Sequence, residues 1–243
     1  MGAPFRDITL YLPTPHIVGT PQYLEQISLE NFVSDLYVQK MKGYKPPKTT
    51  RITIQPAFHD KWDHTWKNGS IIAIAPRFNY DEFKILDKQG QYKYLLDLIQ
   101  GVTIQLSDEY KWDKTVFERA YNEVIESKFK FKVECTAKQS RDKKKVARLS
   151  IEKTETETSV HVEIETTGSI LKIKLFDKKN IWWYDCVYIL ARHNKWFDND
   201  RFGISYGKGK IDMWYSIARN EVELFENGVR VTEINFKKIF IFG

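Results

Sequence analysis

The sequence predicts an α+β fold, in which a long antiparallel β-sheet in the C-terminal half packs against a central helix pair and a mixed N-terminal α/β part. Two observations predict it. Residues 92–127 place apolar side chains at a helical period. Most of the chain after residue 127 instead alternates apolar and polar side chains with a period of two. We expect residues 1–243 to form a single domain, with a possible subdivision into residues 1–90 and 91–243.

The N-terminal part begins with a strand and a helix. Asp7–Tyr11 has the composition of a short strand. Thr20 followed by Pro21 is typical of a helix start, because Thr caps the first turn and Pro suits the first helical position. We expect this helix to continue to about Lys42, since the following Gly43 is typical of a helix end.

A hairpin is predicted next. Residues 51–55 alternate as a strand, and Asn68-Gly69 is a strong signal for a two-residue turn. The turn would fold residues 63–67 back on the apolar run at residues 70–75. Residues 77–87 are ambiguous and allow a further strand.

The central helix pair follows. Apolar residues from Leu95 to Leu106 fall at i, i+4, i+7 and i+11, which is one stripe of a helix. After a break, Thr115-x-x-Glu118 has the spacing of a capping box and predicts the start of a second helix. We expect this pair to cover the apolar face of the strands that follow.

Four consecutive segments then alternate as strands, at residues 129–137, 147–151, 160–164 and 171–175. Such a series predicts an antiparallel meander with one apolar face and one charged face. Lysines dominate the charged face of the first and fourth strands, and glutamates that of the third. Cross-strand ion pairs of this kind contribute about 0.2–1 kcal/mol each and help to fix the register.

The chain ends with further β-structure. The apolar segment at residues 181–191 fits either a buried strand or a short buried helix. Residues 211–217 alternate as a strand, and Asn227-Gly228 predicts a hairpin with a type I′ turn. Residues 236–242 read as a last, very apolar strand.

Composition and charge limit the class of protein. No apolar run approaches the length of roughly 18–20 residues that spans a bilayer, so we expect no membrane segment. The first residues lack the pattern of a signal peptide, and two cysteines are too few for a disulfide framework, so we expect a cytoplasmic protein. The net charge is +6, but ten Lys and Arg against three acidic residues give +7 within residues 128–153, so the rest sums to −1.

The basic hairpin at residues 138–148 is the strongest binding feature of the sequence. Such a loop can bind an acidic protein surface, which we favour, or the phosphates of a nucleic acid. A nucleic-acid site is usually accompanied by aromatic stacking platforms, and none occurs between Lys132 and Lys174. The candidate binding residues are Lys138, Arg141, Lys143, Lys144, Lys145 and Arg148.

A second candidate is a metal site formed by His59, Asp63 and His64, which predicts a metal-dependent hydrolase as a further alternative. The spacing is a poor match, because the two histidines are not at i and i+4 and no HExxH motif is present. A polar turn with surface histidines explains the same residues. We therefore expect no cofactor other than, at most, a divalent metal ion at this place.

Exposed aromatic residues are the third candidate. Trp62, Trp66 and Trp196 can anchor a protein partner, although tryptophans are also ordinary core residues of β-rich domains. No nucleophile motif and no glycine-rich phosphate loop is present. The sequence thus favours a non-enzymatic interaction protein with an acidic macromolecular partner. Its composition is typical of bacterial toxin-neutralising or accessory-subunit proteins, and it gives no indication of oligomeric state.

Overall fold

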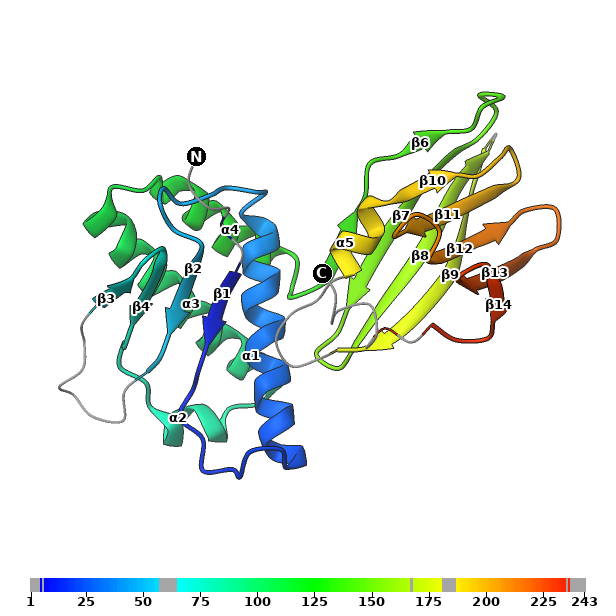
Figure 1. Cartoon of the computed structure of the whole chain (residues 1–243). Helices are drawn as coiled ribbons and strands as arrows, with labels where there is room; N and C mark the ends of the chain where they lie inside the picture. Colours follow the sequence, from blue (N-terminus) through cyan, green and yellow to red (C-terminus); the bar gives the residue numbers. More distant parts are fainter. Residues whose placement is uncertain are drawn as a thin grey trace. The chain divides into compact units, whose positions relative to one another are not determined.

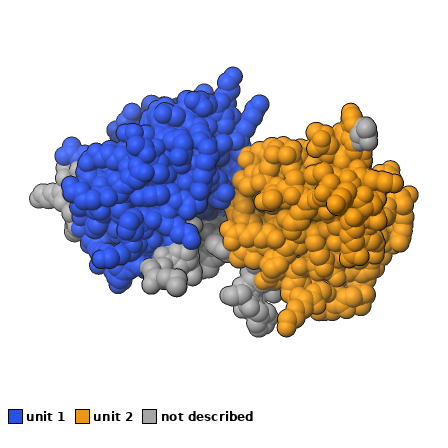
Figure 2. All heavy atoms as spheres, turned by 90° about the horizontal axis from the view of Figure 1, so that it is seen from above, with its two compact units in different colours: residues 1–131 blue, residues 132–243 orange. Residues whose placement is uncertain are grey.

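The computed structural model describes residues 5, 7–56, 65–166, 168–180, 187–234 and 236. The chain forms two compact units, residues 1–131 and residues 132–243, which Figure 2 distinguishes by colour. The predicted helix pair belongs to the first unit. The boundary between the units follows residue 131, near the change from a helical to a strand period in the sequence, and the possible subdivision after residue 90 stays a prediction.

The first unit contains a four-stranded mixed sheet in the order β1-β2-β4-β3 (Figure 1). β1 pairs in parallel with β2, which pairs in parallel with β4, and β3 is antiparallel to β4. The hairpin between β3 and β4 confirms the turn prediction, but its turn residues are Gly69 and Ser70, because Asn68 pairs with Ile71. The strands are β1 (Asp7–Leu10), β2 (Arg51–Ile54), β3 (Thr65–Asn68) and β4 (Ile71–Ile74).

Four helices complete this unit, and two of their starts differ from the predictions. The expected cap at Thr20 is present, since its side chain accepts a hydrogen bond from the Tyr23 amide. Asn79 caps a short helix where a strand seemed possible, because its side chain accepts a hydrogen bond from the Glu82 amide. The last helix is capped by Asp113, whose carboxylate accepts from the Thr115 amide, and not by Thr115. The helices are α1 (Pro21–Lys40), α2 (Tyr80–Ile85), α3 (Lys88–Tyr110) and α4 (Lys114–Glu126).

One buried tyrosine joins the three long helices. The Tyr37 hydroxyl of α1 donates to Gln100 Oε1 at 2.7 Å and lies 2.9 Å from Thr103 Oγ1, both on α3. It also lies 3.3 Å from the Phe117 carbonyl oxygen of α4. The side chain is fully buried, and this burial raises the pKa of the Tyr37 hydroxyl. The hydroxyl is therefore a neutral polar link between α1, α3 and α4.

The described part of the second unit contains two antiparallel sheets and a short helix, α5 (Val187–Arg192). The first sheet has the order β5-β7-β8-β9, and β6 also pairs with β7. Its strands are β5 (Phe131–Glu134), β6 (Lys138–Gln139), β7 (Val146–Lys153), β8 (Glu157–Thr166) and β9 (Ser169–Lys179). The second sheet runs in chain order through β10 (Asn194–Trp196), β11 (Arg201–Tyr206), β12 (Ile211–Ser216), β13 (Glu221–Glu226) and β14 (Val229–Val231).

The predicted α+β fold with a long antiparallel sheet in the C-terminal half is confirmed. The cover of the meander differs from the expectation. Its inward side chains, such as Leu149 and Val162, share one core with Phe202 and Met213 of the second sheet and with Leu190 of α5. The physical reason is that the second sheet also has a one-sided apolar pattern, and two such sheets bury both patterns by packing face to face.

Three remaining predictions concern the C-terminal part. The hairpin at Asn227-Gly228 is confirmed, since Glu226 pairs with Val229 and both turn residues have positive φ. Of the apolar segment at residues 181–191, residues 187–191 are helical, and residues 181–186 lie outside the described residues. The predicted strand at residues 236–242 also lies outside them, apart from Phe236, which packs on Phe176. Among the described residues, no helix has both the length and the apolar character needed to cross a membrane.

Candidate interaction surface

The turn of the basic hairpin, residues 140–145, is a tightly hydrogen-bonded loop, which we call the basic tip. The Ser140 amide donates to the Lys145 carbonyl oxygen at 2.9 Å, and the Lys143 amide donates to the Ser140 carbonyl oxygen at 3.0 Å. The Lys145 amide donates to Ser140 Oγ at 3.1 Å. Lys143 adopts a left-handed conformation with φ of 60°, which closes the turn.

The Asp142 carboxylate stabilises this loop by hydrogen bonds within it. Its Oδ1 atom accepts hydrogen bonds from Ser140 Oγ at 2.6 Å and from the Lys144 amide at 3.2 Å. These two hydrogen bonds lower the pKa of Asp142, so its carboxylate stays charged at neutral pH. The only acidic side chain of the basic tip is thus used to shape the loop.

The basic tip is fixed to the turn between β10 and β11. The Asp142 amide donates to Asn199 Oδ1 at 3.1 Å, and Lys145 Nζ donates to the Asn199 carbonyl oxygen at 2.8 Å. Nearer the base of the hairpin, Trp196 Nε1 donates to the Lys138 carbonyl oxygen at 2.8 Å, and β6 lies beside β10 (Figure 1). The tip is therefore held in one conformation by contacts from a segment more than fifty residues away in sequence.

The six predicted cations divide into two groups. Lys138 Nζ donates to the Asn194 carbonyl oxygen, Lys145 Nζ bonds Asn199, and Arg148 pairs with two carboxylates. Arg141, Lys143 and Lys144 are exposed, and within the described parts of the chain their side chains have no hydrogen-bond or ion-pair partner. Of the six, these three cations have no competing partner among the described residues, and we call them the tip cations.

Arg148 neutralises a buried carboxylate. Glu163 Oε2 accepts from Arg148 Nε at 2.8 Å, and Glu163 Oε1 lies 3.1 Å from Lys132 Nζ, while the Glu163 side chain is only 6% exposed. Burial alone would raise the pKa of Glu163, but the hydrogen bonds from the two cations outweigh it and lower this pKa to about 2. The predicted complementary charges on neighbouring strands are therefore present. Arg148 of β7 forms ion pairs with Glu134 and Glu163 of the neighbouring strands.

The predicted aromatic anchors lie in different places. Trp196 is only 9% exposed, and its ring packs on Phe202 in the core of the second unit. It supports the hairpin and is not part of the exposed surface. Trp66 lies on β3 of the first unit and is 39% exposed. Trp62 lies outside the described residues.

The predicted metal site cannot be placed on this surface. His59, Asp63 and His64 all lie outside the described residues. Across the described ranges, no group of three or more His, Cys, Asp or Glu side chains is arranged to hold a metal ion. The metal-dependent hydrolase remains a prediction of the sequence.

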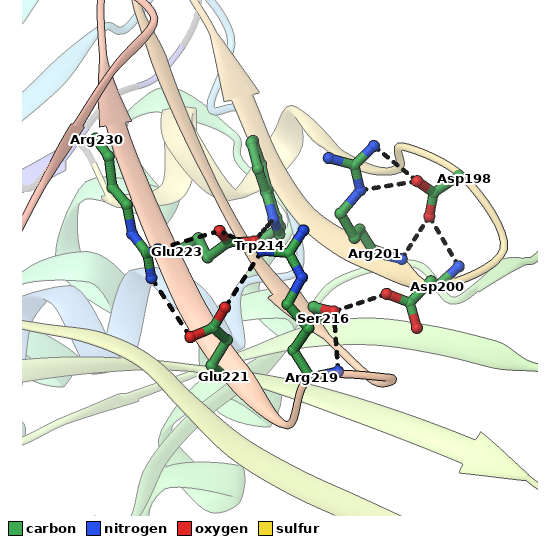
Figure 3. A network of polar contacts seen from close by, with 9 residues as sticks. All are labelled: Asp198, Asp200, Arg201, Trp214, Ser216, Arg219, Glu221, Glu223 and Arg230. Atoms are coloured by element: carbon green, nitrogen blue, oxygen red, sulfur yellow. Dashed lines mark hydrogen bonds and ion pairs between the residues drawn. The ribbon is translucent and has the colours of Figure 1, made fainter.

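The turn that supports the basic tip is itself fixed by a polar network, which Figure 3 shows. Asp198 Oδ1 accepts from the amides of Asp200 and Arg201, both at 2.8 Å, and Asp198 Oδ2 accepts from Arg201 Nε at 2.7 Å. Asp200 accepts from Ser216 Oγ and from the Ala218 amide, each at 2.7 Å. These aspartates are turn-forming residues, and their carboxylates are fully engaged in holding two neighbouring turns together.

The same network continues over the outer face of the second sheet (Figure 3). The buried Glu223 carboxylate accepts from Trp214 Nε1 at 2.9 Å and from Arg219 Nη1 at 3.1 Å. The Trp214 ring stacks on Phe225, with 4.6 Å between ring centroids. The Arg201 guanidinium lies 5.1 Å from the centre of the Trp214 ring. The alternation of β12 and β13 places these residues on one face, but the sequence analysis did not single them out. Because the acid and the arginine are paired, this cluster is structural.

Comparisons of the chain with protein-family models, with curated proteins and with solved structures found no match. The functional interpretation therefore depends on the geometry of the basic tip and of the strands around it.

Proposed function

We propose that this protein is a non-enzymatic interaction protein that binds an acidic protein partner through the tip cations. The observation that supports this proposal most strongly is the contrast within the hairpin. Lys138, Lys145 and Arg148 are used to build and fix the loop, whereas the side chains of the other three cations have no hydrogen-bond or ion-pair partner among the described residues. A rigid loop loses little conformational entropy when it binds, so each contact of these cations contributes more to affinity.

The surface favours a protein over a nucleic acid. The affinity of a protein for nucleic acid depends on the number of phosphates that its cations neutralise, and the basic tip offers only three cations without a partner among the described residues. No aromatic residue occurs in the tip, and Trp196 beside it is buried, so no stacking platform accompanies the charge. Three cations on a loop whose main chain is held by hydrogen bonds complement the charge of a small acidic patch on a protein surface.

Within this class we favour a bacterial toxin-neutralising or accessory-subunit protein, and the composition rich in Lys, Tyr and Trp supports that choice. The two cysteines, which are too few for a disulfide framework, support a reducing compartment such as the cytoplasm.

The test compares two double charge reversals. In K143E/K144E the basic tip becomes acidic. In the control K208E/K210E the same change in charge is made on the exposed turn between β11 and β12, where Lys208 has φ of 59°, matching the left-handed Lys143 at 60°. The immobilised wild type and both variants are incubated with nuclease-treated lysate of the native host, and bound proteins are identified by mass spectrometry.

We expect an acidic protein to be captured by the wild type and by K208E/K210E, to be lost with K143E/K144E, and to elute at moderate salt. Capture that K143E/K144E retains would contradict the proposal. Binding of labelled 20-base-pair DNA or 20-nucleotide RNA at low salt that only K143E/K144E abolishes would establish the nucleic-acid alternative instead.

A further inference from the structure

β9 is an edge strand of the β5-β7-β8-β9 sheet in the second unit (Figure 1), and its first half is exposed. It pairs with β8 along one side over its whole length. Within the residues that the structure describes, no strand pairs with its other side. Residues 169–174 are exposed except for the half-buried Ile173, and the fully buried part of β9 begins only at Leu175. An edge strand of this kind presents a row of unpaired main-chain groups.

The two faces of this half-strand have different chemistry. Leu171 pairs with Ile164 and Ile173 with Val162, so both follow the apolar, core-facing side of β8. Lys172 pairs with Glu163 and Lys174 with His161, which places both lysines on the charged outer face. Ile170 and Leu171 are 64% and 41% exposed, so this half of β9 presents an apolar side chain to solvent on each of its two faces.

The register also indicates which main-chain groups face outward. Thr166 of β8 pairs with Ser169 of β9, so only two positions of the sequence separate the paired ends of this hairpin. In such a hairpin the closing pair is hydrogen-bonded, and in an antiparallel ladder bonded and non-bonded pairs alternate. Leu171 and Ile173 therefore bond to β8, and the amide and carbonyl groups of Ile170 and Lys172 point to the open side.

We propose that the β9 edge over residues 169–174 binds an extended segment of the partner as an additional strand, in which acidic residues alternate with apolar ones. The acidic residues would lie opposite Lys172 and Lys174, and the apolar residues opposite Leu171 and Ile173. Lys172 pairs with Glu152 and Lys174 with Asp177, but the two lysine side chains remain 40% and 54% exposed, so an incoming carboxylate can share them. This inference rests on the proposed function for the acidic character of the partner.

The edge and the basic tip lie at the same end of the first sheet. Val146, which follows the tip directly, pairs with Glu165, and Glu165 pairs with Ile170 at the start of β9. These three residues are among those that line a shallow depression on this face, together with Arg148 and Glu163. One partner can therefore contact the tip cations with a folded acidic surface and the β9 edge with an extended segment.

The probe is an acetylated, amidated peptide in which valine and glutamate alternate over seven residues. It is tested against the full chain together with the same peptide carrying lysine in place of glutamate. Binding is measured by fluorescence anisotropy, and the affected amides are located by hydrogen exchange. We expect only the acidic peptide to bind and to slow exchange at Ile170 and Lys172 by at least tenfold.

Two changes test the main-chain contact. Lys172→Pro removes one outward amide without removing a hydrogen bond to β8, and Lys172→Ala removes the charge but keeps the amide. We expect Lys172→Pro to weaken the acidic peptide at least tenfold and Lys172→Ala at most about threefold. A peptide methylated on alternate main-chain nitrogens, which leaves the protein unchanged, should lose binding when its methyl groups face β9.

The inference would be overturned if Lys172→Pro bound the acidic peptide as tightly as the wild type does and the methylated peptide bound as tightly as the unmethylated one. It would also be overturned if the acidic peptide did not bind at all. Slow exchange at the same amides that depends on protein concentration without peptide would also overturn it, by showing that a second copy of the chain covers the edge. The two proposals fail separately. If K143E/K144E loses the captured protein but Lys172→Pro retains it fully, the strand inference alone is wrong. If the acidic peptide protects β9 but K143E/K144E still captures the same proteins, the proposed function alone is wrong.

Discussion

At the scale of single residues, two buried carboxylates determine how stability depends on pH, and they act in opposite directions. Glu30 of α1 is 1% exposed, and its Oε1 atom accepts a hydrogen bond from Gln26 Nε2 at 3.0 Å. Burial raises the pKa of Glu30 to about 8. Glu163 is also buried, but the cations around it lower its pKa to about 2.

We predict that stability falls between pH 5 and pH 8 because of Glu30. A raised pKa means that the folded state binds the proton more tightly, so the contribution is complete below the unfolded pKa of 4.5 and is lost as pH rises through about 8. The full effect is on the order of 5 kcal/mol, at about 1.4 kcal/mol per pKa unit. Glu30→Gln should flatten the dependence, as measured by urea unfolding at pH 5, 6.5 and 8. Glu25→Gln, an exposed change on the same helix, should leave the wild-type slope.

A second prediction concerns Arg148. Arg148→Met leaves the buried Glu163 carboxylate with a single cation, Lys132, and should lower the free energy of unfolding by about 2 kcal/mol at pH 7. Arg141→Met, which removes an exposed tip cation, should change it by less than about 0.5 kcal/mol. Adding Glu163→Gln to Arg148→Met should recover most of the loss. Equal effects of the two arginine changes would show that Arg148 is not structural.

Because the pKa of Glu163 is lowered, the contribution of Glu163 to stability is present above pH 4.5 and is lost as pH falls through about 2.

At the scale of elements, local signals located most helices and strands, and distant partners explain the differences. Thr20 and Pro21 gave the start of α1, and Asn227-Gly228 gave the last hairpin, because both signals act within a few residues. The spacing of Thr115 to Glu118 fits a capping box, but the helix starts earlier, because Asp113 accepts a hydrogen bond from the Thr115 amide. Short elements such as α2 depend on one capping side chain and are not distinguished by periodicity.

The prediction at this scale concerns the junction of α1, α3 and α4. Tyr37→Phe removes the hydroxyl that contacts Gln100, Thr103 and Phe117 and leaves these buried polar groups without that partner. We expect a loss of about 1–2 kcal/mol in the free energy of unfolding, measured by urea denaturation. Tyr121→Phe is the control, because its hydroxyl makes an exposed hydrogen bond to Asp97, and it should cost less than about 0.5 kcal/mol. Equal losses would contradict a special role for Tyr37.

At the scale of the whole molecule, the sequence indicated the fold class and the basic hairpin but not how either is completed. The cover of the meander comes from a second sheet that begins only at Asn194, and periodicity carries no information on such packing. For the same reason six cations appeared equivalent. Which of them are available depends on Asn194, Asn199 and Glu163, residues that only the folded chain brings beside the hairpin.

The most direct test of the proposed function is the affinity of the captured acidic protein, once purified, for the wild type, K143E/K144E and K208E/K210E, measured by titration calorimetry at two salt concentrations. Reversing two cations at the contact places like charges together, so we expect K143E/K144E to bind at least tenfold more weakly and to lose most of the salt dependence. K208E/K210E should stay within about twofold of the wild type, because these residues lie outside the contact. An affinity that falls equally in both variants, or in neither, would contradict a partner site at the basic tip.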